Sequence, residues 1–113
     1  MLKKKSKTSR KLVMHVIGSG RNFYGVYMTL RTVKIKDTTS RFSFIVSKKV
    51  AARATDRNKI KRRGYSAVET VYGDILPHTA ALFFVKKDAI RASFADIQKD
   101  IVELLTKSKI LLK

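Results

Sequence analysis

The sequence predicts one α+β domain, a two-layer sandwich in which helices pack on a small, mostly antiparallel sheet. The chain has 113 residues, of which 44% are hydrophobic, and this is enough for a single core. Segments 22–35 and 41–49 are rich in aromatic and β-branched residues, as strands are. Segments 53–72 and 93–105 place apolar residues at helical intervals instead. The predicted element order is α-β-β-α-β-α.

The first half of the chain should hold a basic arm, a helix and two strands. Residues 1–8 read as a flexible basic arm, and residues 9–20 as a short helix that ends at glycine. Residues 22–35 read as one strand, and 36–40 as the turn of a hairpin. Residues 41–49 carry apolar side chains on both faces, so we expect this strand at the centre of the sheet.

The second half should hold a helix, a short strand over 80–87 and a last helix. Residues 53–72 form an apolar stripe of Ile60, Gly64, Ala67, Val68 and Val71. Ser93 and Asp96 have the spacing of a capping box, which predicts the start of the last helix. Its core stripe is expected to be Phe94, Ile97, Ile101, Leu104 and Leu105. Residues 108–113 read as a basic tail of the single domain 1–113.

Charge is the strongest compositional signal. Lys and Arg total 26 against 8 Asp and Glu, a net charge of +18. Such a surplus should attract a polyanion, with nucleic acid first and an anionic membrane second. No apolar run approaches the roughly 20 residues that a transmembrane helix needs, so we expect no membrane partner. The chain has no cysteine, which agrees with a cytoplasmic location.

No set of residues in the sequence indicates catalysis or a metal site by the protein itself. Acidic residues are few and no pair has a recognisable acid–base or metal-ligand spacing. The two histidines, His15 and His78, lie too far apart to suggest zinc. His15 is read as a packing or surface residue. We therefore expect the protein to bind and position, with no catalytic residue of its own.

The densest run of charge is "RNKIKRR" at 57–63, inside the predicted helix. Ile60 belongs to the buried stripe, so the polar residues around it should point outward. Arginine grips phosphate with a planar fork and lysine adds a mobile point charge. Like charges four residues apart cost an isolated helix a few tenths of a kcal/mol, which a bound partner can offset. The predicted RNA-binding residues are Arg57, Asn58, Lys59, Lys61, Arg62 and Arg63.

The stretch "VSKKVAARATDRNKIKRR" at 46–63 resembles the signature of the bacterial ribonuclease P protein subunit. Residues 47–50 match its Ser-Lys-Lys-Val, and Arg57, Asn58, Lys61 and Arg62 match its Arg-Asn-Arg helix. The basic arm, the "LFFV" strand and the last helix extend the likeness over most of the chain. Two departures stand out: Lys59 replaces the second arginine of Arg-Asn-Arg, and residues 63–66 read Arg-Gly-Tyr-Ser where the family often has Leu-Leu-Arg-Glu.

The resemblance implies a ribosomal-protein-like fold with a left-handed βαβ crossover, against the usual right-handed rule. It also implies a non-catalytic subunit of an endoribonuclease. In that family the ribonuclease P RNA, with bound Mg²⁺, removes the 5′ leader of precursor tRNA. The protein binds that RNA through the Arg-Asn-Arg helix, holds the leader in a cleft between the sheet and a helix, and helps Mg²⁺ bind. The implied partners are ribonuclease P RNA and precursor tRNA, and the RNA holds most of the Mg²⁺.

A single-stranded leader needs cations along its backbone and aromatic faces for its bases. The cations expected there are Lys48, Lys49 and Arg53. The aromatic residues expected there are Phe23, Tyr27 and Phe44, of which Phe44 is equally readable as core.

Three other functions remain open. A structural RNA-binding protein, such as a ribosomal protein of the same fold, would show the same charge. A duplex-DNA binder would place helix 57–63 in the major groove, although no helix-turn-helix partner precedes it. A stand-alone nuclease is the weakest alternative, because it needs clustered acidic metal ligands.

Overall fold

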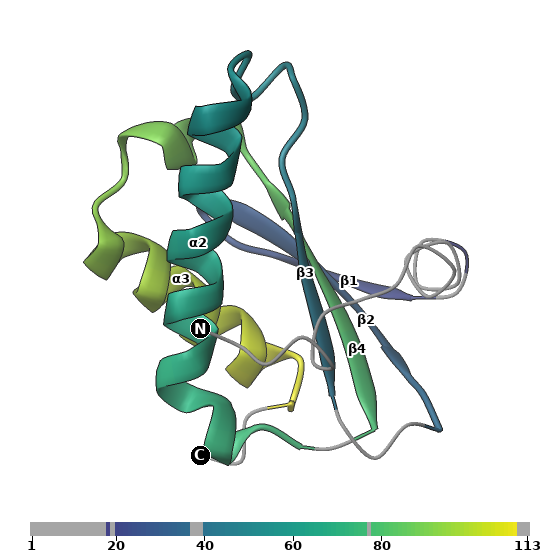
Figure 1. Ribbon diagram of the computed structural model, residues 1–113. Helices are drawn as coiled ribbons and strands as arrows, with labels where there is room; N and C mark the ends of the chain where they lie inside the picture. Colours follow the sequence, from purple (N-terminus) through teal and green to yellow (C-terminus); the bar gives the residue numbers. More distant parts are fainter. Residues whose placement is uncertain (1–17, 19, 37–39, 77, 111–113) are drawn as a thin grey trace.

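A computed structural model describes residues 18, 20–36, 40–76 and 78–110. Its core is a four-stranded sheet with two long helices on one face (Figure 1). The predicted α+β two-layer class with a mostly antiparallel sheet is confirmed. The predicted basic arm and most of the predicted first helix lie outside the described residues.

The described residues form six regular elements and two short 3₁₀ turns. They are β1 (Arg21–Tyr24), β2 (Met28–Lys34), β3 (Arg41–Ile45), α2 (Ala54–Val71), η2 (Tyr72–Asp74), β4 (Thr79–Val85), η3 (Lys87–Arg91) and α3 (Phe94–Lys107). The strand order in the sheet is β1-β2-β4-β3, antiparallel except for the parallel pair β3 and β4. Helix α2 joins those parallel neighbours, so β3, α2 and β4 form a βαβ unit. The left hand expected for this crossover stays a prediction.

The single strand predicted over 22–35 is wrong, because the chain reverses at residues 25–27 and makes a hairpin of β1 and β2. Asp100 of α3 holds this turn. Its carboxylate accepts hydrogen bonds from the backbone N–H groups of Val26 at 2.9 Å, Tyr27 at 3.0 Å and Met28 at 3.1 Å. A Cβ atom at Gly25 would lie 2.6 Å from an Asp100 oxygen, so only glycine allows this approach.

The predicted central position of strand 41–49 and the predicted hairpin at 36–40 are also wrong. Strand β4 lies between β2 and β3, which leaves β3 at the edge of the sheet. The reason is the composition of β4, "TAALFFV", in which six of seven residues are buried. A strand that is apolar on both faces gains most where neighbours cover both edges and both faces.

Helix α2 follows its prediction closely. Ile60, Gly64, Ala67 and Val68 are buried, as is Tyr65. Gly64 sits directly on the ring of Phe44 in β3: a Cβ atom there would lie 2.5 to 2.7 Å from three ring carbons. The "Arg-Gly-Tyr-Ser" departure at 63–66 therefore has a packing reason, since a larger side chain at 64 would push the helix off the sheet.

Helix α3 confirms its cap and most of its stripe. The Ser93 side chain accepts from the Asp96 N–H at 3.1 Å, and the Asp96 carboxylate accepts from the Ser93 N–H at 3.4 Å. Ile97, Ile101, Leu104 and Leu105 are buried. Phe94 was expected in the same stripe but is 40% exposed, because the first turn of α3 lies at the margin of the helical layer (Figure 1).

The predicted basic tail begins later than residue 108. Ile110 is buried and its carbonyl accepts a hydrogen bond from the Leu76 N–H at 2.8 Å. The chain therefore packs against the domain through residue 110.

Replacing Gly64 with alanine should destabilise the protein by about 1–3 kcal/mol, because the new methyl group overlaps the Phe44 ring. In a Phe44→Leu background the same change should be neutral or stabilising, since alanine favours a helix over glycine by about 1 kcal/mol. Urea unfolding of the four proteins of this cycle measures both effects. Equal costs of Gly64→Ala in the two backgrounds would show that the ring contact does not matter.

Asp100→Asn should lower the free energy of unfolding by about 2 kcal/mol or more, because an amide turns one acceptor oxygen into a donor facing backbone N–H groups. Glu103→Gln is the matched control, an acid-to-amide change at an exposed position on the same helix. Thermal unfolding of both variants is the measurement. Equal midpoints would mean that the carboxylate does not hold the hairpin turn.

Candidate RNA interface

The first half of α2 presents the predicted RNA-binding residues on the surface around buried Ile60. Asn58, Lys59 and Arg62 are exposed, while Arg57, Lys61 and Arg63 are half-buried at the two margins of the helix. The positive end of the helix dipole lies at the same end of α2 and adds to their field. The arrangement suits the binding of several phosphates along one helix.

Arg57 also has a structural role, which its position in the sequence does not predict. One guanidinium nitrogen, Nη1, donates to the Ala51 carbonyl at 2.9 Å and to the Ala52 carbonyl at 2.8 Å. These bonds tie the loop after β3 to the start of α2. Guanidinium has five N–H donors, so Nε and Nη2 can still grip a phosphate.

The loop that Arg57 ties down carries the cations predicted for the leader. Lys48 and Lys49 are exposed in a turn closed by two hydrogen bonds, from the Val50 and Ala51 N–H groups to the Ser47 carbonyl. Arg53 is exposed at the N-cap of α2. The predicted leader cations and the predicted RNA-binding helix thus form one continuous surface, called here the basic end.

Sequence reasoning missed the cations that β4 adds to the basic end. Because β3 and β4 are parallel neighbours, their carboxyl ends meet at the same end of the sheet. Ile45 of β3 pairs with Phe84 of β4, and Lys48 and Lys87 each lie three residues beyond their own strand's member of this pair. Lys87 and Arg91 both belong to η3, and both are exposed. The available signal was a Lys-Lys pair close behind each strand: Lys48–Lys49, separated from the end of β3 by two residues, and Lys86–Lys87 directly after β4.

The sheet face opposite the helices offers a different set of residues from those predicted. Register places Tyr24, Thr29, Phe84 and Ile45 in one row across all four strands. The next row is Asn22, Arg31, Leu82 and Ser43. Tyr24 is 66% exposed and Phe84 is half-buried, so this face carries aromatic side chains beside the cation Arg31.

The aromatic residues predicted for the leader lie mainly elsewhere. Phe44 is 2% exposed, stacked on Phe83 at 4.7 Å between ring centres, so it has no face for a base. Phe23 pairs with Leu30 on the helix-covered face and packs against the core there. Tyr27 is half-buried in the hairpin turn. The hairpin reverses the chain between Phe23 and Arg31, so that Phe23 lies on the helix-covered face and Arg31 on the opposite face.

The described residues contain no group of three or more His, Cys, Asp or Glu side chains able to hold a metal ion. Within the same residues, no helix is long and apolar enough to cross a membrane.

The sequence of the whole chain decides the family. A family model described as Ribonuclease P matches residues 1–109. The chain belongs to the ribonuclease P protein component family. A ribonuclease P protein component of Microcystis aeruginosa is 28% identical over 106 residues, which cover 85% of this chain and 83% of that protein. One from a Pseudanabaena species is 26% identical over 97 residues, 85% of this chain and 84% of that protein.

Solved ribonuclease P proteins share the fold. A mutant of the Staphylococcus aureus protein superposes with a TM-score of 0.87 at 21% identity, covering 96% of this chain and 92% of that one. The Thermotoga maritima protein gives 0.79 at 22% identity, covering 87% of this chain and 92% of that one. At these identities the likeness supports the fold and leaves residue roles to the chemistry of this chain.

Arg57→Ala should loosen the loop after β3, because it removes the two bonds to the Ala51 and Ala52 carbonyls. Amide hydrogen exchange of residues 47–53 should become at least several-fold faster. Arg62→Ala removes the same charge from an exposed position and should leave that exchange unchanged. Equal exchange in the two variants would leave Arg57 with charge as its only role.

Proposed function

We propose that this protein is the subunit of ribonuclease P that binds the catalytic RNA and the 5′ leader of precursor tRNA. The observation that carries the proposal is the continuous basic end, formed by the first half of α2 and the loops that follow β3 and β4, in a chain of this family. The proposed place of action is the cytoplasm.

The α2 residues would hold the catalytic RNA. Arg57, Asn58, Lys61 and Arg62 are the motif positions, with Lys59 and Arg63 in support. Phosphate contacts of this kind position a partner and depend on salt, because each neutralised phosphate releases a counterion. Lys59 keeps the positive charge of the arginine that is usual in the family, but it cannot form the bidentate contact that arginine makes with phosphate.

The leader would lie along the sheet face opposite the helices and reach the loop cations. Tyr24 and Phe84 offer rings for bases, and Arg31 stands between β1 and β4 on that face. Lys48, Lys49 and Arg53 would bind the leader phosphates at the point where the single-stranded RNA extends beyond the sheet. Aromatic rings beside cations bind single strands with little sequence preference, which suits leaders of varied sequence.

The hydrolysis itself would belong to the RNA with its Mg²⁺. The described residues do not fit a resident metal site, since they bring no three acidic or histidine side chains together. The protein would contribute by holding RNA and leader together and by screening phosphate repulsion, which lowers the Mg²⁺ concentration that the RNA requires.

A cleavage assay on precursor tRNA at low Mg²⁺ tests the proposal. Bacterial ribonuclease P RNA alone, the protein alone and both together would be compared. We expect cleavage only with both, giving a mature tRNA with a 5′ phosphate.

Arg62→Ala should weaken RNA binding and flatten the slope of log K against log salt by about one unit.

The other results would each point elsewhere. No stimulation of the cognate RNA, with binding to ribosomal subunits instead, would favour a structural ribosomal protein. Cleavage by the protein alone would mean a nuclease active site on the chain. An Arg62→Ala variant with an unchanged salt slope would remove that residue from the interface.

A further inference from the structure

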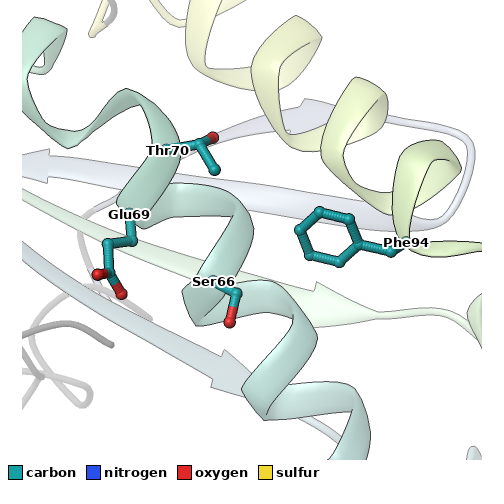
Figure 2. Close-up of a pocket in the computed structure, with 4 residues that line it drawn as sticks. All are labelled: Ser66, Glu69, Thr70 and Phe94. Atoms are coloured by element: carbon teal, nitrogen blue, oxygen red, sulfur yellow. The ribbon is translucent and has the colours of Figure 1, made fainter.

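A partly exposed aromatic ring lies in the groove between α2 and α3. Phe94, the first residue of α3, is 40% exposed and lines an open cavity of about 450 Å³ together with Ser66, Glu69 and Thr70 of α2. Figure 2 shows the ring reaching from α3 toward Ser66. Beside the cavity the two helices are linked, because Gln98 of α3 donates a hydrogen bond to the Thr70 hydroxyl at 3.0 Å.

The groove continues the cation stripe of α2. Residues at i, i+4, i+7 and i+11 of a helix share one side, and here they are Lys59, Arg63, Ser66 and Thr70. The bond between Thr70 and Gln98 shows that this side faces α3. Two cations therefore precede the Phe94 ring along the same side of the helix.

The geometry points to a binding site for one unpaired base of the partner RNA, stacked on Phe94 between α2 and α3. This inference rests on the proposed function. The sugar–phosphate chain would lie toward the cations Arg63 and Lys59. The base would lie on the Phe94 ring, where the Ser66 hydroxyl oxygen can accept a hydrogen bond from an amino group on its edge.

Stacking explains the exposure of Phe94 better than packing does. A ring at this position contributes little to the core, whose α3 stripe is complete with Ile97, Ile101, Leu104 and Leu105. Every base has a flat face that an exposed ring can cover, and one such contact typically contributes about tenfold or more in affinity.

The test compares Phe94→Leu with the unchanged protein in binding to ribonuclease P RNA. Leucine keeps the apolar volume but loses the flat face, so affinity should fall about tenfold. The salt slope should stay unchanged because the lost contact is uncharged. Chemical probing of Watson–Crick edges should show one unpaired base that the unchanged protein protects and Phe94→Leu does not. Phe94→Tyr should restore the protection.

Leu76→Ala is the matched control, since Leu76 is an apolar residue of similar exposure, 36%, that follows η2 beyond the other end of α2 and lies outside the groove. It should leave affinity and protection unchanged. Equal affinity and protection for Phe94→Leu and the unchanged protein would overturn the base site while leaving RNA binding intact. A dimer in sedimentation that Phe94→Leu abolishes would assign the groove to a second copy instead. Absence of RNA binding by the unchanged protein would overturn the proposed function and this inference together.

Discussion

The parallel pairing of β3 with β4 is the constraint on which the rest of the molecule depends. It requires a connection that returns the chain to the same end of the sheet, and α2 is that connection. The pairing brings the Lys-Lys sequences after the two strands to one end. It also starts α2 at that end, so that helix dipole and side-chain charges act in the same place.

Close contact between α2 and the sheet keeps this arrangement rigid. Gly64 lets the helix rest on the Phe44 ring, which is itself stacked on Phe83 of the central strand. Arg57 then ties the loop to the helix through carbonyls. The cations of the basic end are thus displayed by a fixed frame, which limits the conformational entropy lost when a partner binds.

Local patterns predicted the helices well and the sheet poorly. The stripe around Ile60 and the Ser93 capping box are short-range signals, so α2 and the start of α3 could be derived from spacing alone. The position of β4 between β2 and β3 depends on pairing between distant segments, which spacing does not encode. The hairpin turn at Gly25 was hidden for the same reason, because Asp100, which stabilises it, lies over 70 residues away.

The candidate site was also predictable only in part: its short-range patterns could be read from the sequence, and its long-range arrangement could not. The charged run at 57–63 and the Lys48–Lys49 pair were visible in the sequence. The choice of leader aromatics required knowing which face of the sheet each side chain occupies, and the unforeseen hairpin places Phe23 on the helix-covered face. Phe94 illustrates the opposite error, since helical spacing placed it in the core while its position at the start of α3 leaves it in solvent.

The burial of the Asp100 carboxylate affects the charge balance of the free protein, before any partner binds. With only 8 acidic residues in the chain, each carboxylate that serves the interior leaves the exterior less balanced. Repulsion among the α2 cations then opposes the folded state, and bound polyanion relieves it. A bound polyanion should therefore act as a folding ligand, so that the free energy of unfolding is larger for the complex than for the free protein.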